Sequence, residues 1–305
     1  MALMMFAVSV LTFVIFNMIP GGDPALRIAG RSANEVVRQK VREDWGFNEP
    51  RYVQYAEMMK KTFTGDLISY SNQLNVRAEI VRGIPATASL VIGAGVIWLA
   101  LGLLFGVLSA VHQGRWLDRL LNILALVGIS MPVFWVGLVL LYYLTFRVEL
   151  FPPGGYVALT ENPLDWAYHL ILPWFALSIL FIGFYSRLLR SNVLDVASED
   201  YIRTARAKGL SERRVLIRHT LRNALIPIVT LFGLDFGAAF GGGAILTESV
   251  FDLQGVGDYA AGSIGSLDLP PILGVVLYGG FLIVAMSALV DILYAYLDPR
   301  IRLNA

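Results

Sequence analysis

The residue types that could do chemistry on their own are few and scattered. A nucleotide-binding P-loop needs the pattern Gly-x-x-x-x-Gly-Lys-Ser/Thr, in which backbone N–H groups and the lysine hold the phosphates. The four lysines are Lys40, Lys60, Lys61 and Lys208, and none follows a glycine. The three histidines show no metal-ligand spacing, and the sequence has no cysteine and no Gly-x-Ser-x-Gly. We therefore expect no catalytic residue, no metal site and no nucleotide site in this chain.

Positive charge is concentrated in one polar segment. Nine of the 24 lysine and arginine residues lie in residues 187–222. By composition alone, such a basic loop determines membrane topology or contacts lipid headgroups. The segment 198–223 carries most of these charges and holds the most informative local pattern in the sequence.

Local signals divide the segment 198–223 into two short helices. Ser198 or Asp200 can cap the first, and the acidic residues there favour the positive end of the helix dipole. Gly209 is placed to adopt the left-handed conformation that ends a helix. Ser211 can cap the second helix, which would run through Arg222. The prediction is a compact basic helical knob.

The elements that must carry this knob are membrane helices. The 305 residues are 56% hydrophobic and only 15% charged, with net charge +1 and mean hydropathy +0.64, whereas soluble domains have about 25% charged residues. Near-neutral charge gives no reason to expect a nucleic-acid partner. A span needs roughly 17–25 mostly apolar residues, and backbone groups in lipid must be satisfied within the helix. The predicted fold is therefore all-α, with six spans at Ala2–Ile19, Ala86–Val111, Leu121–Phe146, Trp166–Tyr185, Ala224–Leu246 and Pro271–Leu297.

Arginine and lysine predict the orientation, because they gather in short cytoplasmic loops. Thirteen of them fall in the loop between spans two and three, the segment between spans four and five, and the C-terminal tail. This pattern places both termini in the cytoplasm. The first span has no basic stretch before it, so we expect a retained helix rather than a signal peptide.

The long first loop is predicted to lie outside the membrane. This extracytoplasmic insertion, residues 20–85, follows the first span (1–19) and precedes a core domain of five spans (86–305). Its pattern predicts a charged helix over Asn34–Trp45 and a second over Pro50–Phe63. Gly46 and Gly65 are placed to end these helices.

Residues 198–223, called here the coupling segment, contain a stretch that resembles a known motif. Tyr201 to Gly209 reads YIRTARAKG and is similar to the coupling helix of ABC importer permeases of the dipeptide, oligopeptide and nickel family. His219-x-Leu221-x-Asn223 resembles the end of the same motif. Further similar residues are Pro20–Pro24, Gly46-Phe47, Pro50, Gln54-Tyr55, Gly65-Asp66-Leu67, Pro85-x-Thr87, Gly128–Pro132 and Thr247–Phe251.

The resemblance implies a function for the chain and for this motif. The chain would be the B-type member of a pair of homologous transmembrane subunits in a prokaryotic inner membrane. Two ATPase subunits would bind ATP and Mg²⁺, and an extracytoplasmic binding protein would deliver a peptide, a nickel chelate, glutathione or another small solute. The residues that it assigns to ATPase coupling are Tyr201, Ile202, Arg203, Thr204, Ala205, Arg206, Ala207, Lys208 and Gly209.

The sequence departs from the family pattern at three places. It begins directly in a span, which leaves room for a start upstream of Met1, and Leu253–Gly257 lacks the usual proline. Asp235 lies in a span where the family often has glutamine, and a carboxylate in lipid costs roughly 2.5–3.5 kcal/mol on insertion scales. Asp235 therefore either lines the pathway and contacts a substrate amine or hydrogen-bonds a neighbouring helix. Ser130 and Pro132, within the predicted third span, are the other pathway candidates.

Two other classes stay open from the residues alone. A secondary transporter or channel would need no ATPase, and a membrane sensor or scaffold would transport nothing. Neither class accounts for the pattern from Arg203 to Gly209, which favours the importer.

Overall fold

The computed structural model describes residues 2–18, 25, 35–44 and 46–297. In these ranges every regular element is helical, and extended backbone pairs only at an isolated bridge between Ile68 and Asn75. In chain order the helical elements, with η marking π-helical segments, are α1 (Ala2–Met18), α3 (Glu35–Asp44), α4 (Arg51–Thr64), α5 (Val76–Val111), α6 (Trp116–Ser130), α7 (Val133–Leu140), η1 (Leu141–Arg147), α8 (Pro163–Ala197), α9 (Asp200–Ala207), α10 (Glu212–Arg214), η2 (Val215–Thr220), α11 (Leu221–Ala224), α12 (Ile226–Ala238), η3 (Ala239–Gly243), α13 (Ile245–Val250), α14 (Val256–Gly265) and α15 (Leu269–Leu297). The all-α class is confirmed.

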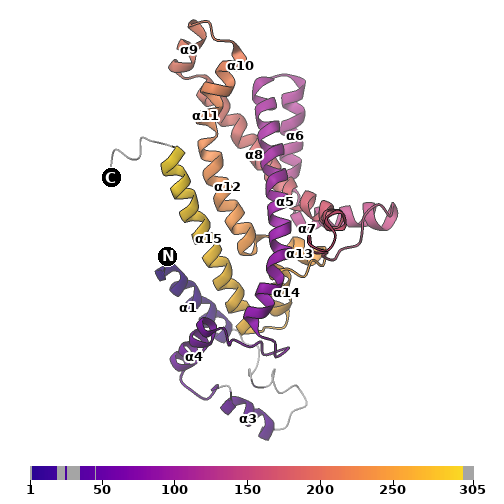
Figure 1. Ribbon diagram of the computed structural model, residues 1–305, viewed down its shortest axis with the longest axis vertical. Helices are drawn as coiled ribbons and strands as arrows, with labels where there is room; N and C mark the ends of the chain where they lie inside the picture. Colours follow the sequence, from indigo (N-terminus) through magenta and orange to yellow (C-terminus); the bar gives the residue numbers. More distant parts are fainter. Residues whose placement is uncertain (1, 19–24, 26–34, 45, 298–305) are drawn as a thin grey trace.

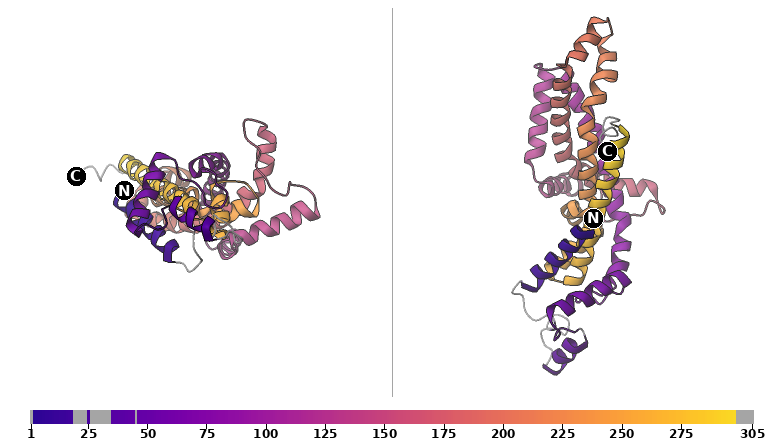
Figure 2. Two further views of the ribbon diagram at one scale, coloured as in Figure 1. Left: turned by 90° about the horizontal axis from the view of Figure 1, so that it is seen from below. Right: turned by 90° about the vertical axis from the view of Figure 1, so that its left-hand side faces the viewer.

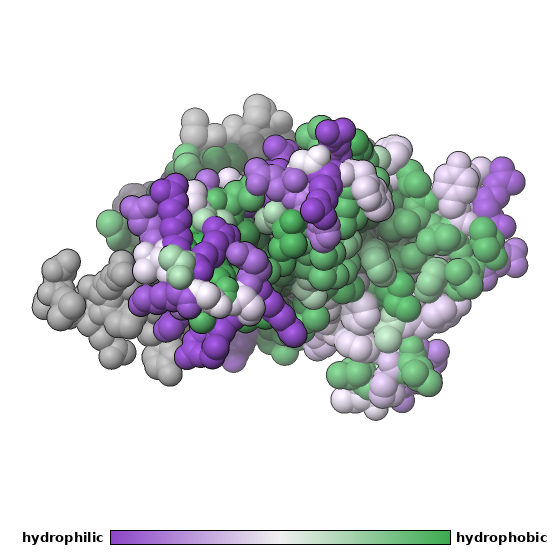
Figure 3. All heavy atoms as spheres, turned by 90° about the horizontal axis from the view of Figure 1, so that it is seen from above, coloured by the Kyte–Doolittle hydropathy of each residue, from purple (hydrophilic) through white to green (hydrophobic). Residues whose placement is uncertain are grey.

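The long helices run side by side along the molecule, as Figures 1 and 2 show. One end, called here the coupling end, carries α9, α10 and the turn between α5 and α6. The opposite end, called here the insertion end, carries α3, α4, α14 and the start of α5. In Figure 3, which looks onto the coupling end, hydrophilic side chains gather over α9 and α10, and hydrophobic ones cover the flanks of the bundle.

Four helices of the described chain are long and apolar enough to cross a membrane. They are α5, α8, the continuous segment Ile226–Gly243, and α15 over Leu269–Val290. They contain most of the predicted second, fourth, fifth and sixth spans. α1 holds a shorter apolar stretch, Leu3–Ile15, and the predicted span there ends at Ile19, outside the described residues. The number six stays a prediction.

The predicted third span, Leu121–Phe146, is wrong as a single straight helix. α6 ends at Ser130, and the axes of α6 and of α7 with η1 differ by 100°. Met131 is extended (φ −89°, ψ 128°), and Pro132 follows it. Proline has no N–H to donate and disfavours the helical conformation in the residue before it, so the helix stops here. If the two arms are counted as one span, the described chain has five.

The core of the bundle forms where α5 packs along α8. Trp98 is fully buried and stacks on Phe181, with ring centroids 4.4 Å apart. An added Cβ at Gly102 would lie 2.8 Å from the Tyr185 Cβ, so the two helices touch almost backbone to backbone. The same holds at Gly106, one turn along α5. The Gly-x-x-x-G of this span is thus a packing contact between helices.

The insertion end holds a smaller apolar cluster. Phe13 of α1, Met58 of α4 and Leu273 of α15 are buried together there. α3 and α4 confirm the two helices expected in the first loop, and Gly65 ends α4 at φ 84° as predicted. Asn34, Trp45 and the Pro20–Pro24 motif lie outside the described residues.

A buried aspartate ties the first loop to the rest of the chain. Asp268, just before α15, accepts hydrogen bonds from the Ser69 hydroxyl (2.6 Å) and from the N–H groups of Tyr70 and Ser71 (3.0 Å each). α5 itself begins at Val76, inside the predicted insertion 20–85. The division at residue 85 into an insertion and a core domain stays a prediction.

Candidate coupling segment and translocation pathway

The turn at Gly209 ends α9 as the sequence predicts. Gly209 has φ 78°, its N–H donates to the Arg206 carbonyl (2.9 Å), and the Leu210 N–H donates to the Ala205 carbonyl (3.4 Å). These two bonds form the Schellman motif, which requires a left-handed residue at this position. Leu210 also packs near Ala205, as the motif favours.

A small core makes the coupling segment one body. Ile202 is fully buried, Ala205 is 7% exposed, and both pack against Val215 of η2, which is 1% exposed. Ile202 and Ala205 are three positions apart and so share one face of α9. α9 therefore folds back onto the second helical stretch, which brings together the two predicted halves of the knob.

The remaining positions of the predicted motif are exposed to solvent. Arg203 pairs with Asp200 (3.3 Å) and Arg206 with Glu212 (3.0 Å), both on the surface. Such pairs are worth roughly 0–1 kcal/mol, so they shape the surface more than they hold it. The exposed residues of the motif are Tyr201, Arg203, Thr204, Arg206, Ala207, Lys208 and Gly209.

Hydrogen bonds attach the knob to the bundle on both sides. The Asn223 amide donates to the Tyr201 hydroxyl (2.7 Å), which joins the two ends of the motif. Asn192 of α8 donates to the Ala224 carbonyl (3.2 Å), and Arg206 donates to the Ala197 carbonyl at 3.5 Å. The knob is thus fixed to the end of α8 and to the helix that enters the next span.

The predicted caps are wrong in detail. α9 starts after Glu199, and Ser198 instead follows the last residue of α8, where its hydroxyl donates to the Asp195 carbonyl (2.7 Å). Ser211 does precede the second helix, but its side chain caps no N–H in the described chain. That helix continues as the π-helical η2 rather than as one regular helix. α9 thus begins without a side-chain cap, and Ile202 in its first turn packs in the small core of the coupling segment.

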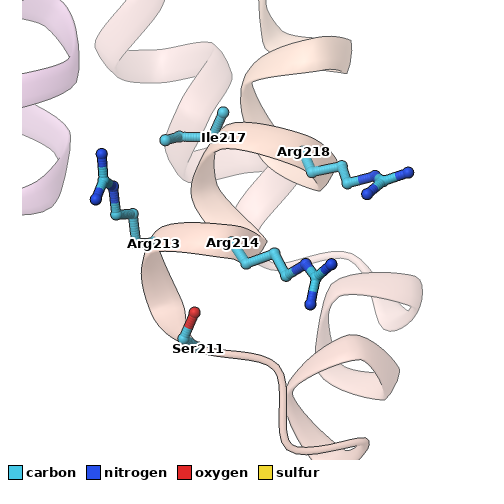
Figure 4. Close-up of a pocket in the computed structure, with 5 residues that line it drawn as sticks. All are labelled: Ser211, Arg213, Arg214, Ile217 and Arg218. Carbon is cyan, nitrogen blue, oxygen red and sulfur yellow. The ribbon is translucent and has the colours of Figure 1, made fainter.

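A shallow groove opens beside the second helical stretch. It has a volume of about 360 Å³ and is lined by Ser211, Arg213, Arg214, Ile217 and Arg218 (Figure 4). Arg214 and Arg218 point to one side and Arg213 to the other. The three guanidinium groups do not converge on one point, so the groove is part of a basic surface rather than a site for a single anion.

The pathway candidates lie on different elements: Ser130 ends α6, Pro132 precedes α7, and Asp235 is on α12. Asp235, half-buried on α12, accepts a hydrogen bond from the hydroxyl of the buried Tyr185 (2.7 Å), which supports the helix-contact interpretation. Ser130 and Pro132 are exposed at the bend, and the Ser130 hydroxyl donates to the Leu126 carbonyl (2.8 Å). In the described chain no hydrogen bond joins Ser130 to Asp235.

Comparison with known proteins decides the family. Residues 102–303 match the family model described as the binding-protein-dependent transport system inner membrane component, and residues 1–91 match the model of its N-terminal part. The chain belongs to this family. It is an ABC importer permease, as the resemblance implied, and a multi-pass inner-membrane protein.

Relatives of this permease cover almost its whole length. A putative peptide transport system permease of Brucella abortus is 38% identical, covering 98% of this chain and 95% of its own. A probable D,D-dipeptide transport system permease of Escherichia coli is 37% identical (99% and 94%). An oligopeptide transport system permease of Bacillus subtilis is also 37% identical (96% and 94%).

A solved structure supports the fold. A chain of the MetNI methionine ABC transporter in an inward-facing conformation aligns with TM-score 0.56 and 17% identity, covering 72% of this permease and 96% of that chain. At this identity the likeness bears on the fold alone.

Besides Asp268, the sequence interpretation did not assign the burial of a second carboxylate at the insertion end. Glu248 of α13 is fully buried and accepts hydrogen bonds from the Thr87 hydroxyl (2.8 Å) and from the N–H groups of Gly257 and Asp258. Burial raises the pKa of Glu248, although these hydrogen bonds oppose the rise. Thr87 also accepts from the Val256 N–H (2.9 Å). Thr87 of α5 and Glu248 of α13 thus accept hydrogen bonds from the free N–H groups of the first turn of α14.

The interpretation also missed a buried carboxylate at the coupling end. Asp118 of α6 is 4% exposed and is bridged by Arg190 of α8. Both Asp118 and Glu248 stood in the sequence as isolated acids beside apolar helices. The signal that could have found them is the charge itself, since an acid beside a span needs a partner.

Proposed function

We propose that this permease is driven by partner ATPases through its coupling segment. The observation that supports this most directly is the form of that segment: a small buried core fixes its shape, and the exposed positions present arginine and lysine. A rigid body of this kind can insert into a groove of another subunit and transmit its movement. ATP and Mg²⁺ would be held by those partners.

The transport step needs two arrangements whose balance ATP shifts. Closing of the ATPase pair would move the coupling segment, and the helices on either side of it, α8 and α12, would move with it. A ligand shifts such an equilibrium only by its differential affinity for the two states, so docking alone is not sufficient. This proposal therefore includes an inward-open and an outward-open state.

The same proposal covers the assembly and the membrane arrangement. The chain would pair with a homologous second permease, two ATPase subunits and an extracytoplasmic binding protein. α1, the four long helices and the bent pair would make six spans, with both termini and the coupling end in the cytoplasm. The insertion end would then face the binding protein. Since relatives are named as peptide, D,D-dipeptide and oligopeptide permeases, we propose peptides as cargo.

Asp235 is the residue that we propose for the pathway. Within the described chain it makes one side-chain hydrogen bond, to Tyr185, which leaves one carboxylate oxygen without a protein partner. A half-buried carboxylate in a span faces the bundle interior or a wet cavity. It could there accept a hydrogen bond from the amino group of a peptide.

A cross-linking experiment tests the docking. The chain has no cysteine, so one introduced cysteine is a unique label. Arg203→Cys places it on the exposed face of α9, and Ala205→Cys places it in the core against Val215 as the control. In the purified complex, Arg203→Cys should cross-link to an ATPase subunit through a short bifunctional reagent, whereas Ala205→Cys should not. No cross-link from Arg203→Cys would contradict the proposal.

Two other functions make different predictions. A secondary transporter or channel would move solute in liposomes that contain the chain without ATPases or nucleotide. A sensor or scaffold would leave peptide uptake unchanged when the gene is deleted. The importer predicts no transport in the first experiment and a loss of uptake in the second.

A further inference from the structure

A polar cluster around the buried carboxylate of Asp118 joins three helices at the coupling end. The Arg190 guanidinium bridges both oxygens of Asp118, with Nε 2.7 Å from Oδ1 and Nη2 2.9 Å from Oδ2. The Asn122 amide (2.7 Å) and the Ser109 hydroxyl donate to Oδ1, and the Gly114 N–H donates to Oδ2 (2.8 Å). The carboxylate thus accepts five hydrogen bonds from four residues.

The cluster fixes how three elements sit against one another. Ser109 lies in the last turn of α5, Asp118 in the first turn of α6, and Arg190 on α8, seven residues before that helix ends. A bidentate arginine–carboxylate pair sets orientation as well as distance, because two parallel bonds must align. α6 therefore cannot rotate against α8 without breaking the pair.

Close packing beside the cluster also opposes sliding of α5 and α6 along α8. A Cβ added at Gly106 of α5 would lie 2.8 Å from the Leu189 Cβ of α8. A Cβ added at Gly183 of α8 would lie 2.5 Å from the Ala125 carbonyl oxygen of α6. The helices are therefore in backbone contact next to the ion pair.

A charged pair with Asp118 buried and the Arg190 side chain 26% exposed is not the easiest way to hold helices together. Well-packed apolar residues of similar volume often stabilise a protein as much as a buried ion pair or more, so the pair needs a reason beyond stability. Its position supplies one, because α8 runs directly from Arg190 into the coupling segment. The segment is attached to α8 through Asn192 and Ala197, as described above.

We infer that Asp118 and Arg190 are positioning residues that make the α5–α6 hairpin move as one body with the coupling segment. This inference rests on the proposed function of that segment. α5 extends from this cluster to the insertion end, where Thr87 meets Glu248. Movement of the knob would therefore reach the opposite end of the bundle through α5 as well as through α12.

Distances between two spin labels test the rigid body. Cysteines replacing the exposed Gln113 and Glu199 place one label on the α5–α6 turn and one at the start of α9. The distance is measured in the complete complex by double electron–electron resonance, once without nucleotide and once in an ATP-trapped state. Arrest of ATP hydrolysis verifies the trapping. We expect one narrow distance distribution, unchanged between the two states. A distance that changes between the states in the otherwise unaltered chain would overturn the inference.

A variant then tests the role of the pair. Asp118→Asn keeps the size of the side chain but loses the charge that faces Arg190. We expect ATP hydrolysis within about twofold of the parent and uptake of labelled di- to pentaalanine reduced about tenfold or more, a loss within the usual range of coupling effects. The label distance should then broaden and depend on nucleotide. Arg190→Lys keeps the charge but cannot bridge both carboxylate oxygens. Its ratio of uptake to ATP hydrolysis should lie between those of the parent and of Asp118→Asn.

Two controls keep the outcomes distinct. An unchanged ratio of uptake to hydrolysis in Asp118→Asn would overturn the inference, since a merely structural role lowers the amount of complex and not its coupling. If that variant does not assemble, the distances in the otherwise unaltered chain and the Arg190→Lys ratio still decide. Failure of Arg203→Cys to cross-link to an ATPase would instead contradict the proposed function itself.

Discussion

Gly209 offers the sharpest perturbation of the coupling segment, because its conformation and its surroundings separate two effects. It has φ 78°, and a Cβ added there would have no other described atom within 4 Å. A substitution therefore meets no steric neighbour in this chain. Within this chain any cost comes from the backbone conformation, and that cost rises along the series Gly, Asn, Ala, Val.

The size of the cost follows from the left-handed region. Holding a non-glycine residue there costs of order 1–3 kcal/mol, least for asparagine and most for a β-branched residue. A cost of 1–3 kcal/mol corresponds to about 5- to 150-fold in an equilibrium. If the turn relaxes, the hydrogen bonds from Gly209 to Arg206 and from Leu210 to Ala205 are lost. The packing of Ile202 against Val215 is then lost as well.

The assay is the ratio of peptide uptake to ATP hydrolysis in the reconstituted complex. Gly209→Asn should keep most of the ratio, Gly209→Ala should lose part of it, and Gly209→Val should lose at least about fivefold. Membrane insertion and the unfolding midpoint should stay close to those of the parent in all three, because the knob lies outside the bundle core. Equal ratios for the valine and asparagine variants would refute the argument from backbone conformation.

Three further changes test the acids Asp235, Glu248 and Asp268. Asp235→Asn keeps an oxygen that accepts the hydrogen bond from Tyr185, so the unfolding midpoint should stay unchanged. Uptake of peptides with a free amino group should fall relative to uptake of N-acetylated peptides. An unchanged ratio of these two uptake rates would rule out the pathway role. Glu248→Ala leaves three buried donors unpaired at about 1–3 kcal/mol each, whereas Glu248→Gln should be much milder in a thermal unfolding measurement. Because burial raises the pKa of Glu248 from its usual 4.5, its native-state protonation is favoured, and the parent should lose stability relative to Glu248→Gln as pH rises above about 4.5. Asp268→Ala should speed amide hydrogen exchange in residues 69–72, and unchanged exchange there would show that the bonds to Asp268 do not hold that loop.

Local sequence signals predicted the helices and the turn of the coupling segment. Glycine at 209 and at 65 ends a helix in the left-handed conformation at both places. These signals are read within one or two turns of chain, so one sequence is sufficient to find them. Apolar runs likewise locate α5, α8 and α15, because lipid requires every span to be apolar along its length.

Composition could not locate the bend between α6 and α7. The run Leu121–Phe146 is mostly apolar and carries no charge, so hydropathy treats it as one span, although Pro132 lies inside it. The same criterion tolerates Pro85 within α5 and Pro173 within α8, where both helices continue. Whether a proline breaks a membrane helix depends on the neighbours that satisfy the freed carbonyl groups, and those neighbours come from distant parts of the chain.

The pairing of buried acids escaped prediction for the same reason. Asp118 and Arg190 are 72 residues apart, and Thr87 and Glu248 are 161 apart. A single sequence shows that an acid beside a span needs a partner but does not show which residue it is. The motif residues Pro85-x-Thr87 and Thr247–Phe251 resembled the family separately, and only the fold shows that they meet at one helix end.

The distribution of these bonds along the bundle bears on the mechanism. Asp118 at the coupling end accepts hydrogen bonds from four residues, and Glu248 and Asp268 at the insertion end accept from three each. Asp235, between the ends, accepts from Tyr185 alone within the described chain. A fully satisfied carboxylate holds its helices in one arrangement, whereas a carboxylate with one bond can change partners at low cost. This distribution suits the proposed mechanism. The two ends of the bundle must transmit the movement of the coupling segment, and the region around Asp235 must release the cargo.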